Sequence, residues 1–196
     1  MKVGIMGGTF DPIHIGHMLA AESARDAYRL DEVWFMPSHI PPHKEDAGVT
    51  GLMRLEMTAE AITGHPSFRS LDWEVKRGGV SYTVDTVRDL RNMYPEHDFS
   101  FIIGADMVAY LPKWDRIEEL AGMITFIGVN RAGTKLSVEA LPDFLQTAVV
   151  TAEMPMIEIS STMIRNRAAA GSSIRYMVPD RVYDYIVRSG IYGIQP

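Results

Sequence analysis

The stretch that decides the fold is KVGIMGGTFDPIHIGH, residues Lys2–His17. Its first part, Lys2–Met6, has the apolar character of a short strand, and two glycines follow it directly. The residues after them, Ile15–Leu30, predict a helix. A helix that begins so soon after a strand presents free N–H groups and a positive dipole end at the strand's carboxyl end, and both favour an anion. The segment therefore predicts the first βα unit of an α/β domain, with a place for an anionic ligand.

Short apolar runs alternate with amphipathic stretches along the rest of the chain. Strands that alternate with helices predict βαβ units and a parallel sheet. The apolar runs Phe99–Ile103 and Ile124–Val129 suit central strands that are buried on both faces. We therefore predict a doubly wound, Rossmann-like parallel sheet with helices on both faces, which binds ligands where the strand order reverses. Further strands are expected at Glu32–Met36, Leu71–Lys76 and Ala148–Ala152, and helices at Leu52–Ile62 (with Leu55, Ala59 and Ile62 in register), Thr83–Met93, Asp115–Ala121, Thr162–Ala170 and Asp180–Ser189.

The length of 196 residues, without an internal repeat or a long linker, predicts a single domain over residues 1–196. Its C-terminal part, about residues 159–196, is expected to be a small helical segment. The chain has no cysteine, so disulfides, thiolate metal sites and cysteine nucleophiles are excluded.

The net charge of −6 and the lack of a Lys/Arg-rich block argue against non-specific nucleic-acid binding. No uncharged apolar run is long enough to span a bilayer, so we expect no membrane partner. The N-terminal residues are too short and too broken for a signal peptide, and a cytoplasmic protein is predicted. The oligomeric state is left open, a homo-oligomer included.

Two histidines, His14 and His17, stand three residues apart at the start of the first predicted helix, with Gly16 between them. That spacing places both imidazoles on one side of the helix turn, where they can donate hydrogen bonds to phosphate oxygens. The chain contains neither a Walker A motif nor the G-x-G-x-x-G fingerprint. Two histidines could also bind a metal, but no third ligand stands at a recognisable spacing, and no protein-bound metal site is predicted.

These residues carry a resemblance. Gly7–His17 resembles the signature of the nucleotidyltransferases with an H-x-G-H motif, and among them the chain resembles the bacterial nicotinate-nucleotide adenylyltransferases. Ile159–Arg165 (ISSTMIR) resembles the second signature of that superfamily, and Ser81–Thr86 (SYTVDT) matches a motif typical of the narrower family. One departure is Arg131-Ala132-Gly133, where family members often have proline after the arginine. Further matches are Pro41–Lys44, Arg54, Leu55, Met57, Gly104–Asp106, Trp114 and Tyr176–Tyr192.

The resemblance implies transfer of the adenylyl group of ATP to nicotinate mononucleotide, which gives nicotinate adenine dinucleotide and pyrophosphate in NAD biosynthesis. The phosphate of the mononucleotide would attack the α-phosphorus in line, without a covalent enzyme intermediate. Mg²⁺ would arrive with ATP, held mainly by phosphates and water. The implied catalytic residues are His14, His17 and Arg165. The implied ATP-binding residues are Gly7, Gly8, Thr9, Phe10, His14, His17, Gly104, Asp106, Arg131, Ile159, Ser160, Ser161, Thr162 and Arg165, and those for the mononucleotide are Lys44, Tyr82, Thr83, Trp114 and Trp73.

Several of these residues also have ordinary structural explanations. The hydroxyls of Ser160–Thr162 could simply cap a helix, and Asp106 could cap a turn. Trp114 could be a packing residue, and Lys44 a solvated surface charge. Two other functions stay open as well: the same chemistry on another acceptor (phosphopantetheine, FMN or nicotinamide mononucleotide), and a nucleotide-binding sensor without turnover.

Overall fold

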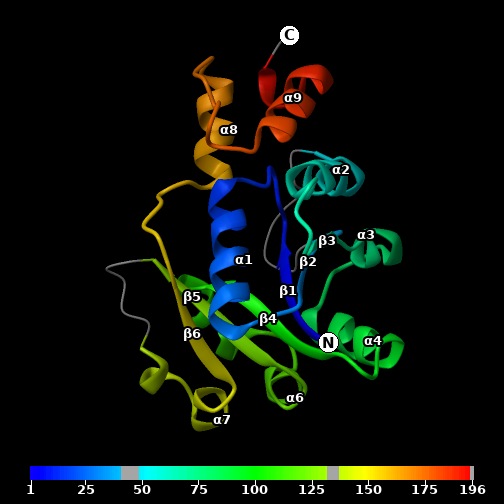
Figure 1. The fold of residues 1–196 in the computed structure, drawn as a ribbon, viewed down its shortest axis with the longest axis vertical. Coiled ribbons are helices and arrows are strands. Elements are labelled where there is room, and N and C mark those ends of the chain that lie inside the picture. Colours follow the sequence, from blue (N-terminus) through cyan, green and yellow to red (C-terminus); the bar gives the residue numbers. More distant parts are fainter. Residues whose placement is uncertain (41–48, 132–136, 195–196) are drawn as a thin grey trace.

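The computed structural model describes residues 1–40, 49–131 and 137–194. Within these ranges, six strands form one parallel sheet in the order β3-β2-β1-β4-β5-β6 (Figure 1). The strand order reverses between β1 and β4, so the predicted doubly wound sheet is confirmed. The strands are β1 (Lys2–Gly8), β2 (Glu32–Pro37), β3 (Phe68–Ser70), β4 (Asp98–Gly104), β5 (Thr125–Arg131) and β6 (Val149–Met154).

Helices cover both faces of the sheet, as predicted. One face carries α1 (Ile15–Tyr28), α2 (Gly51–Ile62), α8 (Ser161–Ala169) and α9 (Asp180–Ser189). The other face carries α3 (Trp73–Arg77), α4 (Thr83–Met93), α5 (Ala105–Val108), α6 (Ile117–Ala121) and α7 (Asp143–Gln146). Short 3₁₀ turns add η1 (Leu111–Lys113), η2 (Val138–Ala140) and η3 (Ile191–Gly193). In Figure 1, α8 and α9 lie at the end of the sheet where α1 begins.

Side chains of the central strands pack into two separate hydrophobic cores, one on each face of the sheet. This follows because successive side chains of a strand point to opposite faces. Val3 and Ile5 of β1 are buried beneath the helices α3–α7, whereas Met6 is buried against α1 and its neighbours. On β4, Phe101 and Ile102 are divided between the two cores in the same way. Burial on both faces explains why these strands are nearly continuous apolar runs.

One predicted strand, Leu71–Lys76, is wrong. The strand lies earlier, at β3, and the chain leaves the sheet where the N–H of Leu71 donates to the carbonyl of Phe35. Residues 73–77 then form helix α3, which ends at Gly78. The alternation of apolar residues at 71, 73 and 75 favoured a strand, but the helix lets Trp73 and Glu74 face α4.

The other predicted strands and helices are confirmed, with small shifts at their ends. The helix predicted from Asp115 begins only at Ile117, because Arg116 adopts a left-handed conformation with φ of 47°. The short elements α5 and α7 and the 3₁₀ turns were not predicted, since one turn of helix leaves no periodic pattern in a sequence. The single-domain organisation with a separate helical C-terminal part stays a prediction.

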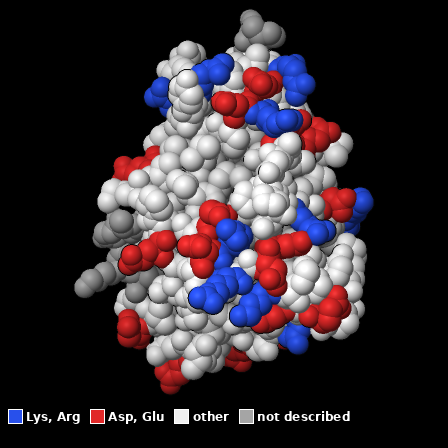
Figure 2. All heavy atoms as spheres, viewed as in Figure 1, with Lys and Arg blue, Asp and Glu red and all other residues white. Residues whose placement is uncertain are grey.

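The described helices include none with the length and hydropathy of a membrane span. On the face of the molecule shown in Figure 2, described Lys and Arg side chains are interspersed with Asp and Glu. The charged side chains of both signs gather at the upper end and over the lower half of this view, with a largely uncharged band between them.

The close packing around β1 predicts that Gly4→Ala destabilises the protein. A Cβ at residue 4 would lie 2.7 Å from Cδ1 of Leu30 and 2.8 Å from Cδ1 of Ile102. Overpacking of this kind costs about 1–3 kcal/mol of unfolding free energy, measurable by urea denaturation. The control is Gly51→Ala, whose new methyl group meets no atom nearer than 3.5 Å. Equal stability of the two variants would contradict the packing described for β1.

Candidate active site

The loop between β1 and α1, residues 9–14, starts where β1 ends at the centre of the sheet. The neighbouring strand β4 ends at Gly104, and Asp106 follows in the first turn of α5. Because the strand order reverses between β1 and β4, a ligand crevice is expected outside these two strand ends. The structure thus brings the H-x-G-H motif to the same edge of the sheet as Gly104 and Asp106, two of the implied ATP-binding residues.

The two histidines of the motif form a stacked pair. His14 is the N-cap residue of α1 and is buried, and its ring stacks on that of His17 with centroids 3.7 Å apart. The backbone N–H of His14 donates to Nδ1 of His17 at 3.2 Å. When the His17 ring is neutral, this bond leaves its proton on Nε2, where it can serve as a hydrogen-bond donor. The ring of Phe10 meets His17 edge-on at 5.0 Å.

Gly16 is required by the close approach of three segments. A Cβ at this position would lie 3.0 Å from two ring atoms of His14 and 3.7 Å from the carbonyl oxygen of Ile159. The start of α1, the His14 ring and the segment before α8 therefore meet around a residue that has no side chain.

The segment ISSTMIR is anchored directly to the β1–α1 loop. Ser161 donates from its hydroxyl to the carbonyl of Pro12 at 2.9 Å. Arg165 donates to the carbonyl of Asp11 at 2.7 Å, and its Nη1 lies 3.7 Å from Oδ2 of the same residue. The two signature motifs, about 150 residues apart in the chain, are thus one structural unit.

The predicted phosphate-binding residues of this segment also have structural partners. The hydroxyl of Ser160 accepts from the N–H of Met163, so it caps α8. Thr162 is within 3.4 Å of the Arg165 guanidinium. Of these four groups, Ser161 and Arg165 contact the histidine loop directly, Ser160 caps α8, and Thr162 lies beside Arg165.

Arg54, for which the sequence suggested no role, binds the loop between β1 and α1. It is 1% exposed and donates to three carbonyls, those of Thr9 at 2.7 Å, Ser38 at 2.7 Å and His39 at 2.9 Å. Burial lowers the pKa of Arg54, and the negative charge of Asp11 opposes that shift.

The buried face of α2 could have pointed to Arg54. That face consists of Arg54, Met57, Thr58 and Ile62, rather than the predicted register of Leu55, Ala59 and Ile62. Of the predicted set, Ala59 is exposed. A charged residue at helical spacing with Met57 and Ile62 was the available signal, since charged side chains are seldom buried without partners.

The segment SYTVDT begins α4 and is tied to the end of β2. Tyr82 is the exposed N-cap residue and Thr83 the first residue of the helix. The hydroxyl of Ser81 accepts from the N–H of His39 at 3.0 Å, and the N–H of Ser81 donates to the carbonyl of Ile40 at 2.9 Å. The loop that Arg54 holds and the segment that carries Tyr82 are therefore directly connected.

A buried carboxyl group, that of Glu74, contacts Thr86 of the SYTVDT segment. Glu74 of α3 accepts a hydrogen bond from the hydroxyl of Thr86 at 2.7 Å, and Arg77 donates to the same hydroxyl at 3.2 Å. Burial raises the pKa of Glu74, whereas the hydrogen bonds from Thr86 and Ser81 lower it. No local pattern pointed to Glu74, because its burial depends on α3 being a helix.

The two tryptophans predicted to contact the mononucleotide pack against the core on the face of the sheet that carries α3–α7. Trp114 meets Phe101 and Phe126 edge-on, at 5.9 and 6.0 Å, and its indole nitrogen is buried without a hydrogen-bond partner among the described residues. Trp73 donates from its indole nitrogen to Asp89 of α4 at 3.2 Å. Lys44 lies outside the described residues, and Arg131 is the last residue of β5, paired in register with Met154.

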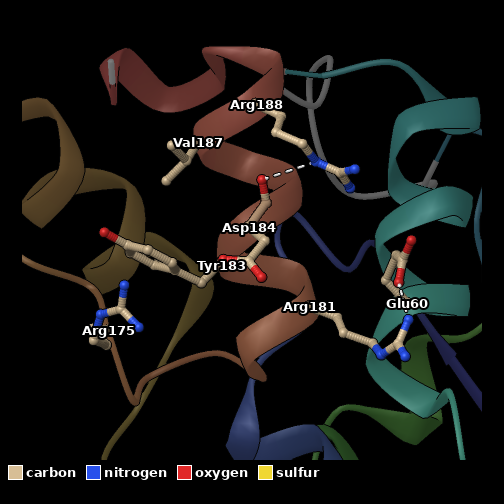
Figure 3. A pocket seen from close by; sticks show the side chains of 7 residues that line it. All are labelled: Glu60, Arg175, Arg181, Tyr183, Asp184, Val187 and Arg188. Atoms are coloured by element: carbon tan, nitrogen blue, oxygen red, sulfur yellow. Dashed lines mark hydrogen bonds and ion pairs between the residues drawn. The ribbon is translucent and has the colours of Figure 1, made fainter. Parts of the chain in front are cut away.

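No group of three or more metal-ligating side chains occurs among the described residues. A hollow of about 790 Å³ lies beside α9, facing Glu60 of α2 (Figure 3). Its three arginines have partners: Arg181 lies 3.5 Å from Glu60, Arg188 donates to the carbonyl of Asp184, and Arg175 lies over the ring of Tyr183. The hollow is lined by none of the predicted site residues.

Comparison with known proteins agrees with this geometry. Residues 5–167 match the cytidylyltransferase-like family model. The chain is 49% identical over 192 residues to a probable nicotinate-nucleotide adenylyltransferase of Oceanobacillus iheyensis, covering 98% of this chain and 97% of the relative. It is 44% identical to the nicotinate-nucleotide adenylyltransferase of Bacillus subtilis, covering 97% and 98% of the two chains. The chain belongs to the nicotinate-nucleotide adenylyltransferase family.

The fold of this family is also found in a more distant solved structure. Plasmodium falciparum nicotinic acid mononucleotide adenylyltransferase complexed with NaAD superposes with a TM-score of 0.82 at 20% identity, covering 99% of this chain and 98% of that one. The resemblance of the sequence to the nicotinate-nucleotide adenylyltransferases is confirmed, and with it the assignment of the chain as a nucleotidyltransferase. The roles of individual site residues stay predictions.

The burial of Arg54 predicts a large stability loss for Arg54→Met. The change leaves the buried carbonyl of Ser38 and the partly buried carbonyls of Thr9 and His39 without their donor, and an unsatisfied buried group costs about 1–3 kcal/mol, so a loss of about 2 kcal/mol or more is expected in urea denaturation. The control is Arg69→Met, which removes a side chain that is 65% exposed and pairs with Glu32. An exposed pair of this kind contributes about 1 kcal/mol or less. Similar losses in both variants would contradict the role of Arg54.

Proposed function

We propose that this chain transfers the adenylyl group of ATP to nicotinate mononucleotide, with nicotinate adenine dinucleotide and pyrophosphate as products. The observation that carries the proposal is the stacked pair of His14 and His17 on a loop bound by Arg165, at the point where the strand order reverses. The names of the relatives at 43–49% identity support the reaction. So do solved structures of the Plasmodium enzyme complexed with NaAD and with APC.

The reaction asks the protein mainly to bring two anions together. An oxygen of the mononucleotide phosphate attacks the α-phosphorus of ATP, and the bond from that phosphorus to the bridging oxygen breaks. Pyrophosphate leaves with that oxygen and the bonding electron pair. Two unit charges 4 Å apart repel by about 4 kcal/mol at an effective dielectric constant of 20, so cationic and dipolar groups must converge there.

We assign the phosphates of ATP to His14, His17 and Arg165, which act as the catalytic groups. The imidazole N–H groups and the guanidinium stabilise negative charge that builds up on the departing pyrophosphate. The N-terminal N–H groups of α8, with Ile159, Ser160, Ser161 and Thr162, would hold the same group, and Thr162 lies within 3.4 Å of the Arg165 guanidinium. Gly7, Gly8, Thr9 and Phe10 supply backbone contacts along β1 and its loop.

The adenosine would lie towards β4 and β5. Asp106, exposed in the first turn of α5, is the proposed acceptor for a ribose hydroxyl, and the lack of a side chain at Gly104 leaves room for the Asp106 carboxylate, whose Oδ1 lies 2.6 Å from where a Cβ of residue 104 would be. Arg131 at the end of β5 is the proposed contact for the adenine.

The mononucleotide would lie on the side of SYTVDT. Tyr82 and Thr83 stand at the N-terminus of α4, whose free N–H groups suit the nicotinate carboxylate. Trp114 is the proposed stacking partner of the ring, and its buried indole N–H is a donor that a ligand could satisfy. Trp73 and Lys44 are the remaining proposed contacts, the first for the ring and the second for the phosphate.

Mg²⁺ enters this reaction as part of the ATP substrate. The described residues offer it no carboxylate cage, and Asp11 already binds Arg165 and Tyr192. Phosphate oxygens and water would therefore hold the ion. A cytoplasmic location, no nucleic-acid or membrane partner and an open oligomeric state stay predictions.

The site predicts that His14→Ala lowers kcat by about 10²–10³-fold, because it removes a donor to the transition state. The circular dichroism spectrum and the melting temperature should show that the variant folds. The control is His65→Ala, which removes a ring that stacks on Phe68 and pairs with Glu22 outside the site. Near-normal turnover of folded His14→Ala would remove this residue from the mechanism.

The reaction itself is tested by pyrophosphate release with MgATP and either nicotinate mononucleotide or its amide. Release with the acid that exceeds release with the amide is the expected result, because the N-terminus of α4 favours a carboxylate. Comparable rates would keep the chemistry and contradict the assignment of Tyr82 and Thr83. Release with neither substrate would contradict the proposed function, and phosphopantetheine and FMN would then be compared as acceptors.

A further inference from the structure

The C-terminal end of the described chain returns to the catalytic loop. Tyr192, in η3, donates from its hydroxyl to Oδ1 of Asp11 at 2.5 Å, across 181 residues of sequence. Asp11 is 5% exposed and precedes Pro12 in the loop between β1 and His14. A residue near the C-terminal end of the described chain therefore contacts the loop that joins β1 to α1.

The carboxylate of Asp11 is held from two sides. Tyr192 binds Oδ1, while Nη1 of Arg165 lies 3.7 Å from Oδ2 and donates to the carbonyl of the same residue at 2.7 Å. The next carbonyl, that of Pro12, accepts from Ser161. The backbone carbonyls of residues 11 and 12 thus bind the proposed phosphate-binding segment through Arg165 and Ser161. Tyr192 holds the side chain of Asp11.

Two further features suit Tyr192 to this role. Burial and the Asp11 carboxylate both raise its pKa, so the hydroxyl keeps its proton and stays a donor. Its φ of 58° lies in the left-handed region, which is unfavourable for a residue with a Cβ. Such a conformation persists where the surroundings hold it in place.

We propose that Tyr192 is a positioning residue of the transfer reaction: by holding Asp11, it fixes the 11–12 backbone and, through it, Arg165 and Ser161 on the pyrophosphate side of the site. This inference rests on the proposed function. It concerns the ATP side alone, because the segment that leads into α4 is tied through Ser81 to the loop after β2 by separate contacts.

The chain offers a matched control for its test. Tyr185 of α9 also donates to a carboxylate at 2.5 Å, Oε2 of Glu56 on α2, and burial together with this contact raises its pKa to about 12. Tyr185→Phe and Tyr192→Phe each delete one hydroxyl from a short tyrosine–carboxylate bond in the same part of the fold. Only the second bond reaches the catalytic loop.

The experiment measures pyrophosphate release for both variants and the unchanged protein, below the melting temperature of the least stable one. We expect Tyr192→Phe to lower kcat by about tenfold while KM for nicotinate mononucleotide stays within about twofold, and Tyr185→Phe to change neither by more than about twofold. Equal effects of the two variants, or a rise in that KM with an unchanged kcat, would overturn the proposal.

A double-mutant cycle separates positioning from general stability. If Tyr192 acts through Arg165, the tenfold effect of Tyr192→Phe should shrink to about twofold or less in an Arg165→Lys background. The full effect in that background would overturn the proposal. Failure of the unchanged protein to release pyrophosphate would instead contradict the proposed function, so the two claims fail separately.

Discussion

The buried guanidinium of Arg54 is the constraint on which the rest of the site depends. Its two terminal nitrogens bind carbonyl oxygens from the loop after β1 and the loop after β2, and these three hydrogen bonds offset much of the cost of burying the charge, although Nε has no hydrogen-bond partner among the described residues. The first loop carries the histidines, and the second is tied to the start of α4 through Ser81. One side chain thereby sets the distance between the proposed ATP side and the proposed mononucleotide side.

The C-terminal part of the chain also holds the loop between β1 and α1. Ser161 and Arg165 bind the carbonyls of residues 11 and 12, and the N–H of Ile15 at the start of α1 donates to the carbonyl of Met177. Figure 1 shows α8 and α9 at the end of the sheet where α1 begins, which is the edge that these contacts require. An in-line transfer between two anions needs this rigidity, because small displacements of the reacting groups are costly in rate.

Much of the fold was predictable because the sheet is buried on both faces. Apolar runs such as Phe99–Ile103 and the glycine-rich turn before His14 are local signals, and they predicted the strand positions and the βα unit. The wrong prediction concerns a segment whose secondary structure is decided by tertiary contacts. The residues after Leu71 alternate like a strand, yet they form α3 because Glu74 and Trp73 find partners on α4.

The site was predictable where it resembles a known family and hidden where it depends on burial. The two motifs pointed to His14, His17 and Arg165, and the structure joins them through Asp11 and Pro12. Arg54 and Tyr192 carried no local sign of their roles, because a buried donor is recognised only by its acceptors, and those lie up to 181 residues away. The two serines of ISSTMIR show that an expected ligand contact can also be a structural one.

The central claim is that ATP binds where β1 and β4 diverge, over the loop that Arg54 and Arg165 hold. The most direct measurement is a crystal structure of the chain with a non-reactive ATP analogue and Mg²⁺. The account predicts phosphate oxygens within hydrogen-bond distance of His14, His17 and Arg165, with the ribose beside Asp106. An analogue bound elsewhere, for example in the arginine-lined hollow beside α9 of Figure 3, with the histidine pair untouched, would contradict it.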